Sequence, residues 1–181
     1  MAAVVAGCGV LALSAMTPQA ARAQQPRLEA PFGNRVSGAV SNYNRLRVTI
    51  ATAGLLREGA VAELKALRFA AIIDLRMSEE GTAGEQQAVE AAGLRYANIP
   101  ISAAAPTEAQ LDQFARLVED GANHPLLVHC ASANRVGALW THYLVQRKGV
   151  PFALAVEEGR AIGLQPSREA GVRAALGGPA N

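Results

Sequence analysis

Short apolar runs alternate with helix-like segments along this chain, and the alternation restricts its fold more than any other feature. Residues 70–75 (Ala-Ala-Ile-Ile-Asp-Leu) and residues 126–128 are continuous apolar runs of the kind that form buried parallel strands. Residues 45–50 and 96–101 have the composition of two further short strands. Segments suited to helices occupy residues 59–68, 81–93, 106–118, 136–146, 151–162 and 166–176. The pattern predicts a single α/β domain whose central sheet is mainly parallel and flanked by helices.

Size and composition allow one packed domain and exclude several functional classes. The chain has 181 residues, 50% of them hydrophobic, which suffices for one core but not for two full-sized domains. With 17 Lys and Arg against 15 Asp and Glu, the formal charge is +2, so we expect no basic face for nucleic acid. Two cysteines, Cys8 and Cys130, are too few for a disulfide framework or an all-cysteine zinc site.

The first 23 residues have the pattern of a signal peptide. Residues 2–16 are apolar or small, and Ala21-Arg22-Ala23 has the form of an A-x-A cleavage site. The apolar stretch is shorter than the ~20 residues that span a bilayer. We therefore expect cleavage after residue 23, export to the periplasm, and no stable membrane span in the mature protein. Residues 24–44 are then a polar lead-in, and residues 45–181 form the domain.

Two other interpretations of the N-terminus stay open. Val5-Ala6-Gly7-Cys8 resembles a lipoprotein cleavage box, although the apolar run continues beyond Cys8. A buried N-terminal helix would also be apolar, but the break at Pro18 suits export better. No Lys or Arg precedes the apolar stretch, as a signal peptide usually requires. If residues 1–23 are removed, Cys130 is the one cysteine left and has no partner for an intramolecular disulfide.

Residues 127–139 (Leu-Val-His-Cys-Ala-Ser-Ala-Asn-Arg-Val-Gly-Ala-Leu) combine the features of a site for a reactive cysteine. A buried strand delivers Cys130 to its carboxyl end, where parallel sheets bind their ligands. Four small residues follow, which let the backbone turn its N–H groups inward as an anion-binding nest. Arg135 then starts a helix whose N-terminus adds partial positive charge. The strand end, the loop of small residues and the arginine at the helix start together indicate that Cys130 is a nucleophilic thiolate. The alternative interpretation is a buried, inert thiol.

The sequence His129-Cys130, with Arg135 after it, resembles the signature loop of the cysteine-dependent protein tyrosine and dual-specificity phosphatases. The chain is most similar to the bacterial phosphatase-like domain of beta-lactamase-hydrolase-like proteins, because residues 41–45, 72–76 and 98–101 also occur in that family's order. The resemblance implies a phosphatase-type α/β fold and a phosphorylated protein or small molecule as substrate. It implies that Cys130 is the nucleophile and that His129 organises the loop. Phosphate would be bound by the loop, which consists of Ala131, Ser132, Ala133, Asn134 and Arg135.

Three departures from the phosphatase pattern leave the reaction open. Four residues separate the cysteine from Arg135, as in rhodanese sulfurtransferases, whereas phosphatases have five. Val136 stands where phosphatases place a Ser or Thr that hydrogen-bonds the thiolate. Residues 102–107, where the general acid is expected, contain no acidic side chain, so Glu108 and Asp112 are the nearest candidates. Acidic residues in a first helical turn also have a purely electrostatic explanation, the helix dipole.

Three functions therefore stay open. The leading hypothesis is hydrolysis of phosphate monoesters through a phosphocysteine on Cys130. The second is sulfur transfer, in which the same thiolate carries a persulfide from a sulfur donor and no alkoxide needs a proton. The third is an anion-binding or interaction domain without catalytic activity. We expect no cofactor, and the sequence does not predict an oligomeric state.

Other polar and aromatic residues have mainly structural interpretations. Asp74 and Arg76 end a central strand and are expected to pair with neighbouring charged groups. Asn134 is expected to cap the helix that follows the loop. Trp140 and Tyr143 are expected to pack in the core. The other two histidines have no acidic or cysteine neighbours at ligand spacing, so no metal is predicted.

Overall fold

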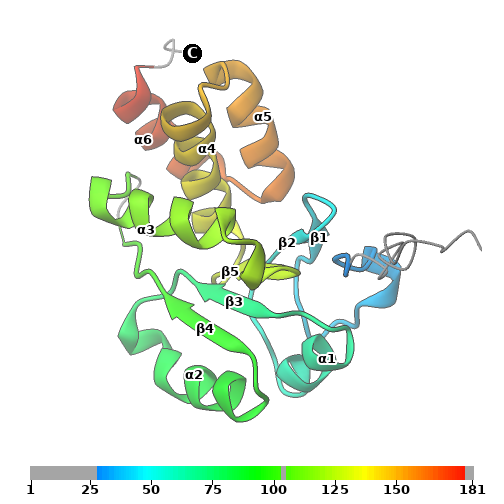
Figure 1. The fold of residues 1–181 in the computed structure, drawn as a ribbon. Helices are drawn as coiled ribbons and strands as arrows, with labels where there is room; N and C mark the ends of the chain where they lie inside the picture. Colours follow the sequence, from blue (N-terminus) through cyan, green and yellow to red (C-terminus); the bar gives the residue numbers. More distant parts are fainter. Residues whose placement is uncertain (1–27, 103–104, 178–181) are drawn as a thin grey trace, which may run out of the picture.

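Five strands form one sheet in the computed structural model, which describes residues 28–102 and 105–177 (Figure 1). Their order across the sheet is β1-β2-β5-β3-β4. β1 is antiparallel to β2, and the other neighbouring pairs are parallel. The predicted α/β class with a mainly parallel sheet is therefore confirmed. The strands are β1 (Asn44–Arg45), β2 (Ile50–Ala53), β3 (Ala71–Asp74), β4 (Arg95–Asn98) and β5 (Leu126–His129).

Helices cover both faces of the sheet in the described residues. The α-helices are α1 (Ala60–Ala66), α2 (Thr82–Ala91), α3 (Glu108–Glu119), α4 (Asn134–Lys148), α5 (Phe152–Ile162) and α6 (Pro166–Leu176). The part of the chain that the structure describes also contains three short 3₁₀ helices: η2 (Gly33–Arg35), η3 (Ser78–Glu80) and η4 (Gly121–Asn123). The predicted helices thus form, with their ends shifted by a few residues.

The two faces of the sheet carry separate cores because side chains alternate along each strand. On β5, Leu126 and Val128 join the core under α3, α4 and α5, whereas Leu127 joins the core under α1 and α2. The first core contains the neighbouring rings of Phe114, Trp140 and Tyr143, with Phe114 edge-on to both partners. The prediction that the tryptophan and tyrosine pack in the core is confirmed. A third, smaller core lies between α4, α5 and α6.

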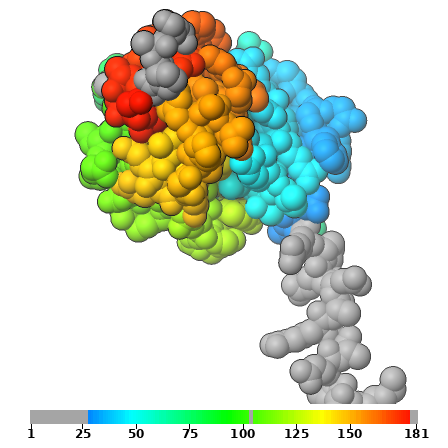
Figure 2. Space-filling model, turned by 90° about the horizontal axis from the view of Figure 1, so that it is seen from above, coloured from blue at the N-terminus to red at the C-terminus, as the bar shows by residue number. Residues whose placement is uncertain are grey.

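Figure 2 shows the face of the molecule that the C-terminal helices cover, coloured yellow to red. The N-terminal residues of the domain, blue to cyan, lie beside them. Residues far apart in sequence therefore meet on this side of the sheet, and Asn44 Nδ2, for example, donates a hydrogen bond to the carbonyl of Ala161 at 3.3 Å.

A capping box sets the start of α3. The Thr107 hydroxyl accepts a hydrogen bond from the backbone N–H of Gln110 at 3.2 Å, and the Gln110 side chain accepts one from the N–H of Thr107 at 2.8 Å. These contacts satisfy two donors that a helix end leaves without a partner. Pro106 therefore lies just outside the helix that the sequence predicted it to open.

The single strand predicted over residues 45–50 is wrong. The chain forms two antiparallel strands there, β1 and β2, joined by a turn in which the N–H of Arg47 donates to the carbonyl of Ile50 at 2.9 Å. All four residues of β2 are buried because it lies between β1 and β5 and is covered on both faces. Because Ala51 and Ala53 are small, the sequence of β2 shows neither alternating apolar and polar residues nor a run of large apolar side chains. It therefore lacks the pattern by which a strand is predicted.

The predicted signal peptide, residues 1–23, lies outside the described residues. Among the described helices, none has the length and apolar content to cross a membrane.

Candidate active site

Cys130 follows directly on β5, at the carboxyl end of the central strand. Parallel neighbours β2 and β3 hold β5 on both sides, and the backbone N–H of Cys130 continues this pairing by donating to the carbonyl of Ala53 at 3.4 Å. The Cys130 side chain is fully buried among the apolar residues on the α3–α5 side. It is the one free cysteine in the described part of the chain. The fold therefore places the predicted nucleophile in a fixed, water-poor position.

Residues 131–133 turn the chain sharply between β5 and α4. Ala133 makes the turn in the left-handed region, with φ 68°, and it is the residue immediately before α4. A left-handed conformation costs a residue with a Cβ about 1–2 kcal/mol, and it is rarely adopted by larger side chains. The small side chain of Ala133 suits this turn, and the inward-facing N–H groups predicted for the loop stay a prediction. α4 begins at Asn134, so its N-terminal N–H groups start at the loop.

Neighbouring segments fix the loop from two sides. Asn42 Nδ2 donates to the carbonyl of Ser132 at 3.4 Å. On the other side, the turn between α5 and α6 packs so tightly that a Cβ on Gly163 would lie 3.0 Å from the Cβ of Ala133. The loop thus has little room to change conformation.

Asn134 does not cap α4, and the prediction that it would is wrong. The residue at the cap position is Ala133, and Asn134 is the first residue inside the helix. Its Oδ1 accepts a hydrogen bond from the backbone N–H of Gln165, the cap residue of α6, at 3.0 Å. Because of the left-handed turn at Ala133, the helix begins at Asn134, one residue earlier than predicted. The Asn134 side chain is therefore directed toward α6. The contact ties the start of α6 to the loop.

Arg135 lies in the first turn of α4 and contacts both Cys130 and Glu80. Its Nη1 and Nη2 each donate to one carboxylate oxygen of Glu80 at 2.6 Å. The hydrogen bonds to Glu80 raise the pKa of Arg135, and burial opposes this effect. The charge of Cys130 and a hydrogen bond to it raise the pKa further. The same ion pair lowers the pKa of Glu80 to about 2, so this carboxylate is ionised at neutral pH. The structure thus brings the predicted nucleophile and the predicted phosphate-binding arginine together.

Arg168 brings a second guanidinium to the same place. It is the third residue of α6, whose start is held at the loop by the contact between Asn134 and Gln165. Burial and then the charge of Arg135 lower the pKa of Arg168, while the charge of Cys130 raises it. Arg168 is therefore within electrostatic range of both residues. Its sequence position, 38 residues after the nucleophile with no motif around it, gave no signal of this.

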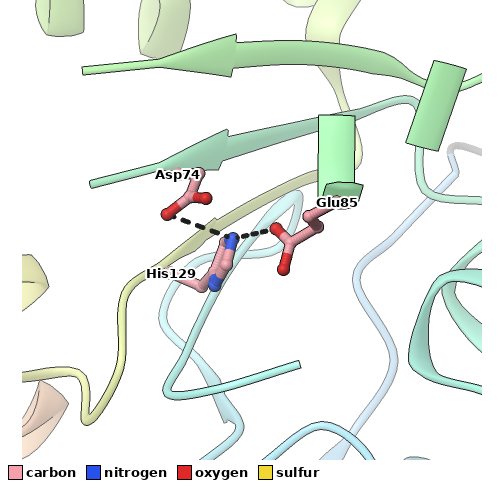
Figure 3. Close-up of side chains that lie close together, drawn as sticks. All are labelled: Asp74, Glu85 and His129. Atoms are coloured by element: carbon pink, nitrogen blue, oxygen red, sulfur yellow. Dashed lines mark ion pairs between the residues drawn. The ribbon is translucent and has the colours of Figure 1, made fainter. Parts of the chain in front are cut away.

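His129 points to the opposite face from Cys130 and enters a buried cluster of charged groups (Figure 3). Its Nε2 lies 2.7 Å from Glu85 Oε1 and 3.6 Å from Asp74 Oδ1. Its Nδ1 lies 3.3 Å from the carbonyl oxygen of Gly54. The histidine is fully buried. His129 is therefore held on both ring nitrogens by residues outside the loop, and the loop-organising role that the resemblance implies stays a prediction.

Arg76, two residues after the end of β3, completes this cluster. Its Nη2 donates to Asp74 Oδ2 at 2.8 Å and to Glu85 Oε2 at 2.6 Å. Burial opposes ionisation of Asp74, but the hydrogen bonds from Arg76 and the charge of His129 outweigh it and lower the pKa of Asp74. The Tyr96 hydroxyl donates to Asp74 Oδ2 at 2.9 Å. The pairing predicted for Asp74 and Arg76 is present, and they pair with each other.

The family of the chain follows from its similarity to known proteins. Residues 35–170, most of the chain, match the family described as DSP-PTPase phosphatase fused to NAD+ Kinase. The chain belongs to this phosphatase family. It is therefore a phosphatase of the protein tyrosine or dual-specificity type, and the cysteine-dependent phosphatase superfamily predicted from the loop is confirmed. No curated protein is a significant match.

Solved structures of other phosphatases share the fold. Tk-PTP in its active form is 21% identical, with a TM-score of 0.62 over 75% of this chain and 95% of that chain. TpbA of P. aeruginosa is 20% identical, with a TM-score of 0.60 over 78% of this chain and 85% of that chain. The catalytic core of the PP-IP phosphatase SIW14 of S. cerevisiae is 16% identical, with a TM-score of 0.59 over 76% and 87%. These similarities confirm the predicted phosphatase-like fold.

The two candidate general acids of this phosphatase are not brought to the loop. Glu108 and Asp112 both accept hydrogen bonds from Arg147 Nη2, at 2.6 and 2.8 Å. Arg147 is near the last turn of α4, and at 1.5 Å per residue it is roughly 18 Å along the helix from Arg135. Both carboxylates are largely exposed. Their place in the structure is at the far end of α4 from Cys130.

Proposed function

We propose that this phosphatase hydrolyses phosphate monoesters through a phosphocysteine intermediate on Cys130. The observation that carries the proposal is the position of Cys130, which is buried at the end of β5, contacts Arg135 and faces the start of α4. A thiolate in this place would have the Arg135 guanidinium and the N-terminal N–H groups of α4 beside the point where a phosphoryl group would bind. The loop of residues 131–135 would hold the equatorial oxygens.

The reaction would proceed in two displacements. The Cys130 thiolate attacks phosphorus, the Sγ–P bond forms, and the P–O bond to the leaving group breaks. Water then attacks the phosphocysteine, the Sγ–P bond breaks, and inorganic phosphate leaves with the thiolate restored. Arg135 would stabilise the oxygens of both transition states, and Arg168 would add a second positive charge beside them.

The described residues include no acid that suits protonation of the leaving group. Glu80 is the acidic residue that contacts Arg135, and its pKa of about 2 leaves it without a proton at neutral pH. Without a general acid, the rate depends on how well the leaving group carries negative charge. Good leaving groups such as aryl oxides are therefore the expected substrates. A phosphorylated tyrosine side chain would fit better than a phosphorylated serine.

Two aryl phosphates test the mechanism. We expect the purified protein to hydrolyse 4-nitrophenyl phosphate and to hydrolyse phenyl phosphate far more slowly. Cys130→Ser should abolish both reactions, and rapid acid quenching of the wild type should trap a phosphate adduct on the Cys130 peptide. Serine is close to cysteine in size, so Cys130→Ser should fold like the wild type. A folded but inactive variant then assigns the loss of activity to the missing thiol. Equal kcat/KM values for the two esters would show that a general acid operates, because kcat/KM reports the step in which the P–O bond breaks. Activity of Cys130→Ser would overturn the proposal.

Sulfur transfer is the second candidate, favoured by the four-residue spacing between Cys130 and Arg135. In that reaction the thiolate would take a sulfane sulfur from thiosulfate, release sulfite and pass the sulfur to cyanide as thiocyanate. Thiocyanate formation with a +32 Da adduct on Cys130, and no phosphate release, would replace the phosphatase proposal with this one.

We also propose that the protein is exported and that residues 1–23 are removed. The support is the apolar stretch followed by Ala21-Arg22-Ala23. Mass spectrometry of the protein from the periplasmic fraction of the producing bacterium should give an N-terminus at Gln24. Intact Met1 in a cytoplasmic fraction would contradict the proposal.

A further inference from the structure

The turn at Ser41 and Asn42 meets the loop that follows the nucleophile. Asn42 Nδ2 donates a hydrogen bond to the backbone carbonyl of Ser132 at 3.4 Å, although the two residues are 90 positions apart in the sequence. Residues 41–45 carried part of the family resemblance, but the two displacements of the proposed reaction give them no task. A side chain that binds a loop from outside can control how the loop directs its own N–H groups.

Two features fix the direction of the Asn42 side chain. The backbone of Asn42 is left-handed, with φ 50°, a conformation that asparagine adopts more readily than most residues with a Cβ. Its neighbour Ser41 is bound to the segment after β2. The N–H and the Oγ of Ser41 donate to the carbonyl of Leu55 at 3.1 and 2.8 Å, and its carbonyl accepts from the N–H of Gly54 at 2.7 Å. The turn is therefore held independently of its contact with the loop.

Gly54 shows how closely the turn and the loop approach each other. This glycine is buried, and a Cβ on it would lie 2.9 Å from Ser41 Oγ, 3.2 Å from Asn42 Nδ2 and 3.3 Å from the carbonyl oxygen of Ala131. Atoms of both segments therefore converge over a residue without a side chain. The carbonyl groups of Ala131 and Ser132 thus both lie on the side of the loop that faces Gly54 and Asn42.

The direction of a carbonyl group fixes the direction of the next N–H group along the chain. In a planar trans peptide the C=O and the following N–H point in opposite directions, and the two peptide bonds concerned are trans. The N–H groups of Ser132 and Ala133 therefore point away from the Asn42 turn. Within the described residues, neither N–H has a protein acceptor. Both are available to an anion bound in the loop.

We propose that Asn42 is a positioning residue of the phosphatase reaction: its amide holds the Ser132 carbonyl on the outside of the loop, so that the N–H of Ala133 faces the phosphoryl group. Asn42 touches no reacting atom and acts through the loop. A donor that is directed in advance needs no reorganisation when charge develops on the phosphoryl oxygens. The inference rests on the proposed function for its catalytic consequence, but its effect on anion binding is measurable without turnover.

Asparagine meets two demands at this position, and two substitutions separate them. Its side chain carries an NH₂ group that can donate to a carbonyl, and its backbone tolerates a positive φ. Aspartate has the same shape and a similar tolerance, but it offers only acceptor atoms and would repel the Ser132 carbonyl. Glycine adopts the same φ without strain, adds no charge and supplies no donor. The hydrogen bond and the backbone conformation can therefore be tested separately.

Binding of inorganic phosphate to the purified protein is the test. In the wild type, the N–H signal of Ala133 in ¹⁵N-alanine-labelled protein should move downfield as phosphate is added, because an N–H that donates to an anion is deshielded. Calorimetric titration should show phosphate binding about 5-fold weaker in Asn42→Gly, the equivalent of one hydrogen bond, and about 10-fold weaker in Asn42→Asp. The Ala133 signal should move less in both variants, and kcat/KM for 4-nitrophenyl phosphate should fall by at least the same factors.

Asn44→Asp is the matched control. Asn44 lies two residues further along, and its Nδ2 also donates to a backbone carbonyl, that of Ala161 on α5, at 3.3 Å. The variant adds the same charge and removes the same kind of hydrogen bond, but that bond does not reach the loop. Its phosphate affinity should match that of the wild type. Because Asn42 is exposed, its two variants should unfold at nearly the same denaturant concentration as the wild type.

Several outcomes would overturn the inference. Lower stability of the Asn42 variants with unchanged phosphate affinity would show a purely structural contact. Equal losses of affinity in Asn42→Asp and Asn44→Asp, with none in Asn42→Gly, would show an effect of charge alone. A wild-type Ala133 signal that phosphate does not move would overturn the inference without any variant. A wild type that binds phosphate as expected but cleaves no ester would instead overturn the proposed function and leave the positioning role intact.

Discussion

The two faces of the sheet differ most where the nucleophile lies. On the α3–α5 side, Cys130, the residue directly after β5, lies against a core of apolar and aromatic residues. On the α1–α2 side, the same strand ends in His129 against Asp74, Glu85 and Arg76. One step along a strand reverses the side to which a side chain points, so adjacent residues meet opposite environments. The difference shows that one strand can support a rigid, apolar environment on one face of the sheet and a cluster of charged groups on the other.

The two sides are stabilised by different means. The apolar side gains free energy from buried surface and close packing, and it holds the backbone around Cys130 in place. The charged side gains little net stability from its ion pairs, since taking charges out of water offsets most of their attraction. Removing one partner is costly all the same, because it leaves the other charges buried without compensation. Changes on the first side should therefore act on folding through lost packing, and changes on the second through an uncompensated buried charge.

Removing the central ring of the apolar side should have the largest effect on stability. Phe114 is fully buried, with ring centroids 6.2 Å from Trp140 and 5.6 Å from Tyr143. Phe114→Ala leaves a cavity that α3 cannot fill, so the free energy of unfolding should fall by about 4 kcal/mol. Denaturant unfolding measures this change. The control is Phe32→Ala at a 65% exposed position, and equal losses in the two variants would contradict the comparison.

Removing the cation of the charged side, Arg76, should lower the stability of the fold somewhat less than removing Phe114. Arg76→Met leaves Asp74 and Glu85 buried without their shared partner, and the free energy of unfolding should fall by about 3 kcal/mol at pH 7. The loss should shrink at acidic pH, where the carboxylates take up protons. Arg116→Met, which removes an exposed arginine from α3, is the matched control in the same denaturation experiment. A loss for Arg76→Met as small as the control's would show that the cluster is not electrostatically coupled.

Sequence alone predicted the apolar side better than the charged side. The runs at β3 and β5, the stripe of α3 and the loop after Cys130 are local patterns, and each forms nearly where it was expected. These patterns depend on residues a few positions apart, and burial follows directly from them. The hairpin of β1 and β2 was missed because its buried alanines carry no alternating pattern.

The residues missed at the site share a different property. Glu80, Glu85 and Arg168 lie 38 to 50 residues from Cys130 in sequence, in segments that resemble ordinary solvated helix starts. Their roles depend on which helix ends the fold brings to the carboxyl edge of the sheet, and no local spacing encodes that. Asn134 was assigned to the wrong contact because the left-handed turn at Ala133 moves the helix start.

Arg168, at the start of α6, gives the α3–α5 side a charge of its own, and its removal should weaken substrate binding. Arg168→Met takes away a cation within range of Cys130 and Arg135, so KM for 4-nitrophenyl phosphate should rise about 10-fold with a smaller change in kcat. Competitive inhibition by inorganic phosphate should weaken by the same factor. Arg116→Met again serves as the control for loss of a positive charge. An unchanged KM and an unchanged phosphate inhibition constant would exclude Arg168 from the site.

The smallest expected effect concerns Glu80, which connects the two sides by reaching from η3, after β3, to Arg135 on α4. Its pKa is about 2 in the folded protein against an ordinary value of 4.5, so its ion pair stabilises the fold fully above pH 4.5. That contribution disappears as the pH falls from 4.5 through 2. The pair is partly exposed, so its contribution should be about 1 kcal/mol or less.

Glu80→Gln should therefore lower the free energy of unfolding by a small, constant amount between pH 6 and 8, and the difference from wild type should vanish near pH 2. Denaturant titrations at several pH values measure both parts of this curve. The variant should also free the outer edge of Arg135, so that phosphate binds at least as tightly as in the wild type. A difference in stability that grows as the pH falls would have the wrong sign for an ionised Glu80, and weaker phosphate binding would mean that Glu80 holds Arg135 in the orientation that the phosphoryl group needs.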